Sequence, residues 1–404
     1  MTSVTEGHWI TGLLSERAKM AGKGPVGLDP KSAADVIAFG GGYPDHSTLP
    51  INDLLESTRI ALERDGEWAL QYAFGAGIPE LVDALRDKLR RDQGIAAEPN
   101  NILITNGASQ ALGLIFEAFV NPGDPILTEA PFFLGAVNRC RASGADAREV
   151  PLDEDGLVVS ELESRIRELK GEGKHPRFLY VVPTFQNPTG ITYSLERRKQ
   201  IIDICREHQI PILEDDAYYD LRFSGDHIPT FYELADPGMV LYVGTFSKII
   251  GAGLRLGWVV ADPDIIGHLT GLKTDASTNT VTSHIVAEFT SSGTLAEHIT
   301  QLRSLYRHRC EVMLRALESQ MPEGVEWTKP DGGFFIWVTL PKGMAGAEIA
   351  EQARARGVGV GVGTFFFTGE GGENNIRLSY SFNTDEEIES GIATLAEVIR
   401  EQMS

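Results

Sequence analysis

Residues 240–255 have the sequence VLYVGTFSKIIGAGLR, an apolar strand followed by a lysine, a glycine turn and an arginine. The segment VLYVGTFSK predicts a buried strand that ends at Lys248. A lysine set between hydroxyls and a glycine turn is unlike a surface lysine on a helix face. In a partly apolar, cation-rich site its pKa falls and its amine can form a Schiff base, and Arg255 can clamp an anion. The alternative for Lys248 alone is a rim residue whose amine reaches solvent.

Similar apolar segments alternate with helical patterns from about residue 50 to residue 285. The strand segments are NILITNG, PILTEA, RFLYVVP, ILEDDAYYD and LRLGWVVA, which begin at residues 101, 125, 177, 212 and 254. Helical patterns lie between them, one of them closed by Gly94 and another capped by Ser194. This alternation predicts a mainly parallel sheet covered on both faces, with functional residues at the carboxyl ends of the strands.

The pattern changes after about residue 286. A long helix over about 294–319 is followed by GGFFIWVTL, a helix at 346–356, GVGVGV, NIRLSYSF and a final helix. This succession predicts an α+β lobe with an antiparallel sheet. We therefore expect an N-terminal arm over residues 1–45 that joins the small domain, a large domain over 46–285 and a small domain over 286–404.

Two turns that follow predicted strands are candidate binding segments. Asn106–Gln110 leads from a strand into a helix, whose unpaired N–H groups and positive dipole end favour a phosphate. An ordinary turn capped by Ser109 is the alternative. Asn187–Gly190 has the sequence NPTG, which is turn chemistry and by itself indicates only a loop.

Charged residues in the apolar segments are the other candidates. Asp215 and Asp216 close one strand, and such a pair is either solvated or has a partner for its charge, such as a protonated ring nitrogen. Because side chains alternate along a strand, we expect Asp215 rather than Asp216 to face that ring, with Tyr218 nearby. Arg377 lies inside the strand NIRLSYS, where it needs a carboxylate from a substrate or from a structural ion pair.

Composition limits the class of protein. The 404 residues include 42% hydrophobic and 23% charged residues, an ordinary globular composition. The net charge of −21 argues against a nucleic-acid or anionic-membrane partner. Three widely spaced cysteines indicate neither a disulfide framework nor a metal cluster, and the N-terminus lacks the pattern of a signal peptide. We expect a cytoplasmic protein without a metal.

Nine segments, taken in order, resemble the class I/II aminotransferases, which are fold type I enzymes dependent on pyridoxal 5′-phosphate (PLP). The resemblance is closest to the branch of 2-aminoadipate and kynurenine aminotransferases and MocR-type effector domains. The segments are GGGYPD, QYAFGAGIPELVDAL, ITNGASQAL, EAPFFLGA, PTFQNPTG, EDDAYYDLRF, GTFSKIIGAGLRLGW, GGFFIWV and NNIRLSYS. The resemblance implies an α/β fold with a mainly parallel seven-stranded sheet in the large domain.

The resemblance also implies a role for each candidate residue. Lys248 would be the Schiff-base lysine and the acid/base, Asp215 would pair with the pyridine nitrogen, and Tyr218 and Asn187 would bind the 3′ oxygen of PLP. The phosphate would be held by Gly107, Ala108, Ser109, Thr245, Ser247 and Arg255. Phe133 would stack on the ring. The substrate would meet Arg377, Asn187, Gly42 and Tyr43, with Gly41 and Gly42 allowing the backbone to approach it.

The same resemblance implies an obligate homodimer. Tyr72 and the 277–280 loop would be contributed across the interface. The arm (about Trp9 to Leu28), Tyr43 and the partner's loop would form the distal pocket. Arg17 and Lys23 are the nearby cations, so we expect neutral or aromatic amino donors to be preferred over aspartate, with 2-oxoglutarate or pyruvate as acceptor.

Three functions remain open from the sequence. The first is an aminotransferase that passes an amino group from an L-amino acid to a 2-oxo acid in a ping-pong cycle. The second is another PLP enzyme on the same scaffold, such as a lyase, a replacement enzyme or a biosynthetic specialist, because PLP supplies the same electron sink in each. The third is the ligand-sensing domain of a regulator, which the missing DNA-binding domain and the charge of −21 disfavour.

Overall fold

A computed structural model describes residues 8–21, 36–275 and 277–403. Its largest sheet has eight strands in the order β2-β9-β8-β7-β6-β3-β4-β5. The strands are β2 (Ile102–Thr105), β3 (Pro125–Ala130), β4 (Asp146–Asp153), β5 (Gly156–Leu157), β6 (Leu179–Val181), β7 (Ile212–Asp215), β8 (Val240–Thr245) and β9 (Gly257–Val260). Parallel pairing joins β4, β3, β6, β7 and β8, whereas β9 pairs antiparallel with both β8 and β2.

The expectation of an α/β fold with a mainly parallel sheet is confirmed, but the sheet has eight strands rather than seven. The additional strand is β5, whose two residues pair antiparallel with the end of β4 after a turn at Glu154–Asp155. Its neighbour β4 was also not among the strand segments found in the sequence. The sequence of β4, DAREVPLD, is polar and only partly buried, because this strand lies near the edge of the sheet.

Helices cover both faces of the large sheet. On one face lie α5 (Ala108–Phe119), α6 (Leu134–Ser143) and α10 (Pro263–Leu272). The opposite face is covered by α4 (Pro79–Gln93), α7 (Val159–Gly171), α8 (Leu195–Glu207), α9 (Phe231–Leu234), α11 (Thr280–Ser291) and α12 (Thr294–Gln320). Alternate strand residues divide between the two cores: Leu103 packs with α5, whereas its neighbours Ile102 and Ile104 pack on the α4 side.

A second, antiparallel sheet has the order β10-β11-β14-β13, as the sequence predicted for the C-terminal lobe. Its strands are β10 (Glu326–Trp327), β11 (Phe335–Thr339), β13 (Gly361–Val362) and β14 (Asn375–Ser379), and α13 (Gly346–Ala355) and α14 (Asp385–Met403) accompany it. The short strands β1 (Ile37–Ala38) and β12 (Val358–Gly359) pair beside it. The domain boundaries at residues 45 and 285 remain predictions.

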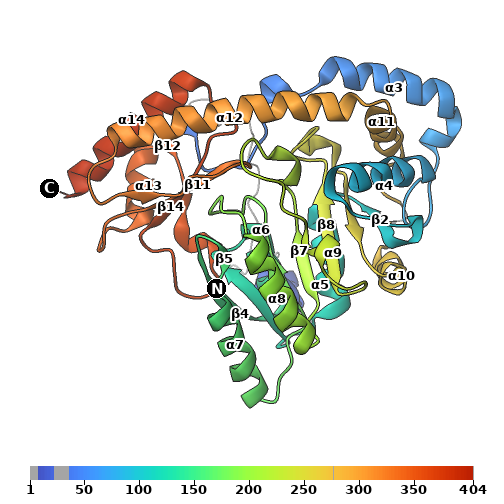
Figure 1. The fold of residues 1–404 in the computed structure, drawn as a ribbon, viewed down its shortest axis with the longest axis horizontal. Helices are drawn as coiled ribbons and strands as arrows, with labels where there is room; N and C mark the ends of the chain where they lie inside the picture. Colours follow the sequence, from blue (N-terminus) through green and yellow to red (C-terminus); the bar gives the residue numbers. More distant parts are fainter. Residues whose placement is uncertain (1–7, 22–35, 276, 404) are drawn as a thin grey trace, which may run out of the picture.

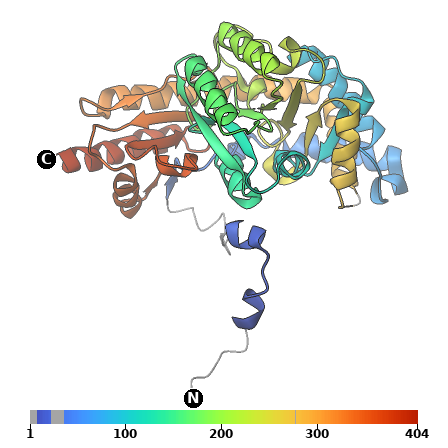
Figure 2. The same ribbon diagram turned by 90° about the horizontal axis from the view of Figure 1, so that it is seen from below.

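The N-terminal arm contains two short helices, α1 (His8–Thr11) and α2 (Glu16–Ala21). Figure 2 shows both helices projecting from the body of the molecule. The Met20 side chain of α2 lies against Gly144 at the end of α6. Apolar side chains of the arm, Ile10, Leu13 and Leu14, are largely exposed. The described part of the arm therefore adds little to the core of this chain.

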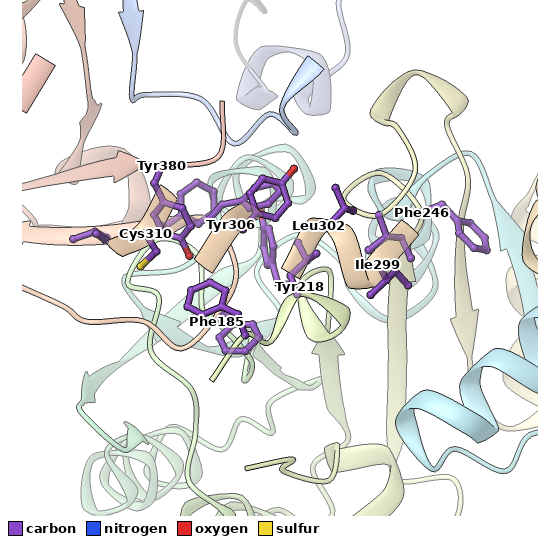
Figure 3. Close-up of a cluster of buried hydrophobic side chains, with 14 of the residues drawn as sticks. Phe185, Tyr218, Phe246, Ile299, Leu302, Tyr306, Cys310 and Tyr380 are labelled. Carbon is purple, nitrogen blue, oxygen red and sulfur yellow. The ribbon is translucent and has the colours of Figure 1, made fainter. Parts of the chain in front are cut away.

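Helix α12 connects the two parts of the molecule. Figure 1 shows it running from above the C-terminal lobe toward the side of the molecule that carries α3 (Ile51–Asp65) and α11. Its buried residues Leu302, Tyr306 and Cys310 form a cluster with Tyr218 and Phe185 (Figure 3). The segment that follows β7 is thus packed against the helix that spans the molecule.

A buried ion pair fixes the same segment to α4. The Lys88 side chain is fully buried, and its Nζ donates to both carboxylate oxygens of Asp220 at 2.9 Å. Asp220 follows Tyr218 by two residues, and its backbone oxygen accepts from Arg303 of α12 at 2.6 Å. These contacts anchor the turn after β7 from two directions.

We predict that Lys88→Met lowers the free energy of unfolding by about 3–5 kcal/mol, because it leaves the Asp220 carboxylate buried without its cation. The double variant Lys88→Met/Asp220→Asn should recover much of this loss. Equilibrium urea unfolding measures both, and Lys199→Met on the exposed face of α8 is the matched control. A loss below about 1 kcal/mol for Lys88→Met would contradict the anchoring role.

Candidate active site

A cavity of about 200 Å³ opens at the carboxyl ends of the parallel strands. Most of the candidate residues from the sequence line it together. The lining residues are Gly42, Tyr43, Ala108, Ser109, Phe133, Val182, Asn187, Asp215, Ala217, Tyr218, Thr245, Ser247, Lys248, Ala252 and Arg255. Gly42 and Tyr43 follow β1. The others lie at the ends of β7 and β8 or in the segments that follow β2, β3, β6, β7 and β8, as expected for a ligand site in an α/β sheet.

One end of the cavity carries donors suited to an anion. Ala108 and Ser109 begin α5, so their backbone N–H groups have no partners within the helix. The hydroxyls of Thr245 and Ser247 and the guanidinium of Arg255 also line this cavity. We name these five residues the anion seat.

Gly107 keeps the anion seat compact. It precedes α5 with a φ of +76°, a conformation that favours glycine, and a Cβ at this position would lie 2.9 Å from Nη2 of Arg255. The absence of a side chain lets the Arg255 guanidinium approach the start of α5.

The two carboxylates at the end of β7 point to different environments. Asp215 lines the cavity, and its Oδ2 accepts a 2.8 Å hydrogen bond from the hydroxyl of Tyr180. The Asp216 carboxylate instead accepts from Tyr242 at 3.2 Å. Burial raises the pKa of Asp215 to about 6, whereas Tyr180 and the nearby Lys248 oppose this shift. A buried carboxylate of this kind is suited to a cationic partner in the cavity.

Lys248 lies near Asp215, and its Nζ donates to the backbone oxygen of Gly42 at 2.9 Å. Desolvation in the cavity lowers the pKa of Lys248 to about 8. The positive charges of Arg377 and Arg255 lower it further, and the charge of Asp215 opposes them. A neutral amine is therefore accessible close to neutral pH, as nucleophilic or base chemistry requires.

Asn187 connects the cavity to Arg377. Its Oδ1 accepts from Nη1 of Arg377 at 2.8 Å, which leaves its Nδ2 as the donor to the Tyr218 hydroxyl. Burial raises the pKa of Tyr218, and both Arg377 and the bond from Asn187 oppose the shift. The three side chains thus form one hydrogen-bonded group beside Lys248.

Arg377 is a buried cation on β14. Its Nη2 donates to the backbone oxygen of Gly40 at 2.6 Å, and its Cζ lies 4.2 Å and 4.8 Å from the ring centroids of Phe335 and Phe366. No described residue accepts a hydrogen bond from its Nε. Burial lowers the pKa of Arg377 to about 10, so it remains charged at neutral pH. Arg377 is not among the lining residues of the cavity, to which it is joined through Asn187.

Other candidate residues lie at the edge of the cavity or outside it. Phe133 supplies an aromatic ring to the lining, and Tyr43 lies at the edge with most of its surface exposed. Tyr72 is exposed and does not line the cavity of its own chain. In the 277–280 loop, Thr278 is buried and donates to the backbone oxygen of Ile104 at 3.0 Å.

Gly42 and Tyr43 at the end of the arm line this cavity, but the two arm helices do not. None of His8–Ala21 is among the lining residues. Lys23, Gly27 and Leu28 lie outside the described residues. The contribution of the arm to a distal pocket stays a prediction.

The residues around the cavity fit PLP. A phosphate matches the anion seat, a protonated pyridine nitrogen matches Asp215, an aldehyde matches the Lys248 amine, and a flat ring matches the aromatic face of Phe133. Within the described ranges no group of three or more His, Cys, Asp or Glu side chains is placed to hold a metal ion. No helix among these residues is both long and apolar enough to cross a membrane.

An eight-stranded sheet with such a site defines a fold type I PLP enzyme, and comparisons with known proteins agree. The family model of class I and II aminotransferases matches residues 34–395. The chain belongs to this family, so it is a PLP-dependent aminotransferase, and the expectations of family, enzyme class and cofactor are confirmed.

Individual relatives give the same family. An aromatic-amino-acid aminotransferase of Thermococcus litoralis is 39% identical over 92% of this chain and 89% of its own length. A 2-aminoadipate transaminase of Thermus thermophilus is 34% identical over 90% of each chain. The crystal structure of a Pyrococcus horikoshii kynurenine aminotransferase, in complex with pyridoxamine phosphate (PMP), superposes with a TM-score of 0.92 at 36% identity over 98% of each chain.

Sequence reasoning missed three groups near the site. Tyr180 lies within an apolar strand, where its hydroxyl gave no signal, yet it donates to Asp215. Glu129 lies near the end of the strand PILTEA. The expectation that functional residues lie at the carboxyl ends of parallel strands could have identified it. The carbonyl of Gly40, which accepts from Arg377, belongs to the backbone and leaves no mark in the sequence.

We predict that Lys248 in the apoprotein reacts with formaldehyde and a borane with a rate that rises with pH around a midpoint near 8, because only the neutral amine reacts. Asp215→Asn should lower this midpoint, since the carboxylate charge favours the ammonium form. Mass spectrometry of the Lys248 peptide measures the rate. A midpoint at the ordinary lysine value of about 10.4 would contradict the electrostatics described above.

Proposed function

We propose that the cavity beside Lys248 is the active site of this aminotransferase and that its residues hold PLP, move the substrate α proton and bind the substrate carboxylate. One observation carries the proposal. A lysine amine, a buried carboxylate and the anion seat line a single cavity, and Arg377 is hydrogen-bonded to Asn187 in its wall.

The bound cofactor supplies an electron sink for the negative charge that develops at the substrate α carbon. In our proposal Asp215 keeps the ring nitrogen protonated, and Tyr180 holds the Asp215 carboxylate in place through its 2.8 Å bond. Tyr218 and Asn187 donate to the 3′ oxygen. The anion seat and Gly107 hold the phosphate.

Lys248 is the proposed acid and base. Its pKa of about 8 leaves a useful fraction of neutral amine near neutral pH, so Nζ can take a proton from the α carbon and return it to a neighbouring atom. The backbone oxygen of Gly42, 2.9 Å from Nζ, orients the amine.

Arg377 is the proposed receptor for the α-carboxylate that all amino and oxo acid substrates share. Asn187 and Gly40 each accept from one terminal nitrogen, and each of these nitrogens has a second N–H to donate. A planar guanidinium fixed in this way favours a two-pronged interaction with a carboxylate.

We propose that the amino donor has a neutral or aromatic side chain. Among the described lining residues the cations are Lys248 and Arg255, and both are already assigned to the cofactor. The aromatic-amino-acid aminotransferase of Thermococcus litoralis supports this class of donor. A 2-oxo acid takes the amino group in the second half of the cycle.

We predict that phenylalanine or leucine converts the PLP form to PMP, and that 2-oxoglutarate or pyruvate reverses the change, as absorbance spectra would show. Aspartate and 2-aminoadipate should have lower kcat/KM values, because among the described residues no further cation lines the cavity. An advantage above about tenfold for either dicarboxylic donor, roughly 1.4 kcal/mol, would contradict this donor class. Failure of any 2-oxo acid to reverse the spectrum would contradict transamination itself.

We also propose that the enzyme acts as a homodimer. Between α3 and α4 the large apolar side chains Trp68, Leu70, Tyr72 and Phe74 have between 71% and 79% of their surface exposed. Such a cluster of exposed apolar residues is typical of an interface rather than of a solvated loop. Tyr72 would then reach the anion seat of the partner subunit, and the 277–280 loop would lie at the same interface.

Mixed dimers test whether Tyr72 acts across the interface. A dimer of one Tyr72→Phe chain and one Lys248→Ala chain should retain one intact site, because the Lys248→Ala chain supplies Tyr72 to its partner. A dimer of a wild-type chain with a Tyr72→Phe/Lys248→Ala chain should retain none. We predict a PLP dissociation constant about tenfold lower, or 1.4 kcal/mol tighter, for the best site of the first dimer. The reverse order, or a monomeric protein, would contradict the proposal.

We place the enzyme in the cytoplasm. Cys140, Cys205 and Cys310 are buried free thiols, a state that suits a reducing compartment. The division into an arm over residues 1–45, a large domain over 46–285 and a small domain over 286–404 is part of the same proposal. The pairing of β1 with β12 supports the attachment of the arm to the small domain.

A further inference from the structure

Glu129 lies at the end of β3, next to the site but outside the cavity lining, and is fully buried. Its carboxylate accepts hydrogen bonds from the backbone N–H of Val182, from Nε2 of Gln186 at 2.9 Å and from the hydroxyl of Tyr193. Burying a carboxylate without hydrogen-bond donors destabilises the folded state. The three donors to Glu129 therefore indicate that its carboxylate is held in one position.

The donors around Glu129 require an acceptor. The N–H of Val182 and the amide nitrogen of Gln186 can only donate, and both reach Oε1 of Glu129. A glutamine at position 129 could keep its oxygen at the Oε1 position and turn its NH₂ group toward the hydroxyl of Tyr193, which can also accept. Glu129→Met, which removes both acceptor oxygens, is therefore the variant that deprives Gln186 of this partner. Burial raises the pKa of Glu129 to about 7, although its three donors oppose the shift, so assays above that pH keep it ionised.

Glu129 and the backbone oxygen of Pro131 together fix the orientation of the Gln186 amide. Gln186 directs Nε2 toward Glu129 and toward the backbone oxygen of Pro131 at 2.7 Å. Its Oε1 is therefore left to accept from the backbone N–H and the hydroxyl of Thr189, at 2.8 and 2.6 Å. The backbone N–H of Gly190 also donates to the backbone oxygen of Gln186 at 2.6 Å, and together these contacts close the turn that contains Asn187.

The closed turn presents Asn187 to two other groups of the site. Asn187 Oδ1 lies 2.8 Å from Nη1 of Arg377, and its amide nitrogen donates to Tyr218. A reoriented Gln186 would release the turn and shift Asn187. The Arg377 guanidinium would then lose one of its two fixed partners.

We propose that Glu129 is a positioning residue for recognition of the substrate carboxylate, acting through Gln186 and Asn187 on Arg377. This inference rests on the proposed function of Arg377. Glu129 does not contact the substrate, and its effect reaches the site through the orientation of one amide and the turn that this amide closes.

The test compares Glu129→Met with Tyr193→Phe above pH 7. Glu129→Met removes the acceptor of Gln186, whereas Tyr193→Phe disturbs the same buried carboxylate but leaves the bond from Gln186 intact. We expect Glu129→Met to raise KM for both phenylalanine and 2-oxoglutarate about tenfold while kcat changes by less than about threefold, the signature of lost binding to the free enzyme. Tyr193→Phe should leave both KM values within about twofold of wild type at a comparable loss of thermal stability.

Binding of 3-phenylpropanoate, an unreactive carboxylate, gives a readout that is independent of turnover. Calorimetry should show about tenfold weaker binding to Glu129→Met and little change for Tyr193→Phe. If Glu129→Met fails to fold, Gln186→Met removes the amide through which Glu129 acts and should reproduce the effect. Equal KM changes in the two variants, or a fall in kcat with KM unchanged, would overturn the positioning role.

Arg377→Lys separates failure of this inference from failure of the proposed function. If Arg377→Lys raises KM for both substrates and Glu129→Met does not, the role of Arg377 stands and the positioning role of Glu129 is overturned. If Arg377→Lys leaves KM unchanged, the assignment of Arg377 as the carboxylate receptor is wrong, and the inference falls with it.

Discussion

The common edge at which β3, β6, β7 and β8 end is the constraint on which the site depends. Parallel pairing of these strands brings their carboxyl ends together, so Glu129, the turn at Asn187, Asp215 and Lys248 lie close although more than a hundred residues separate the first from the last. Some backbone groups just beyond these strand ends, such as the N–H of Val182, make no hydrogen bonds within the sheet, so they can bind other groups. The same edge therefore supplies both the charged side chains and the donors that keep them buried.

Burial at this edge of the sheet brings the pKa values of Asp215 and Lys248 closer together. Desolvation alone would neutralise Asp215 and Lys248, and it shifts the pKa of the acid up to about 6 and that of the amine down to about 8. The two groups limit each other's shift because their charges are opposite. Arg377 pushes the amine further toward its neutral form. An acid that stays ionised beside an amine that loses its proton easily is the combination that the proposed chemistry requires.

Much of this edge could be predicted from sequence, because strand ends are marked by sudden polarity after apolar runs. The choice of Asp215 over Asp216 needed only the alternation of side chains along a strand, and the structure places Asp215 alone of the two in the cavity lining. The polar edge strand β4 had no such mark and was missed. Tyr180 and the Gly40 carbonyl were missed because their roles arise from pairing with residues remote in sequence. The chain sequence by itself contains no signal for such pairings.

The anion seat and the proposed carboxylate seat differ in how many parts of the molecule they need. The anion seat draws only on loops of the eight-stranded sheet, after β2 and after β8. The carboxylate seat joins Arg377 on β14, the turn at Asn187 and the backbone of Gly40. The segment that contains Gly40 also contains Gly42, whose oxygen accepts from Lys248. With the proposed roles, cofactor binding would survive changes in the C-terminal lobe that abolish substrate binding. The backbone at residues 40–42 would then couple the proposed substrate receptor, Arg377, to the proposed acid and base, Lys248.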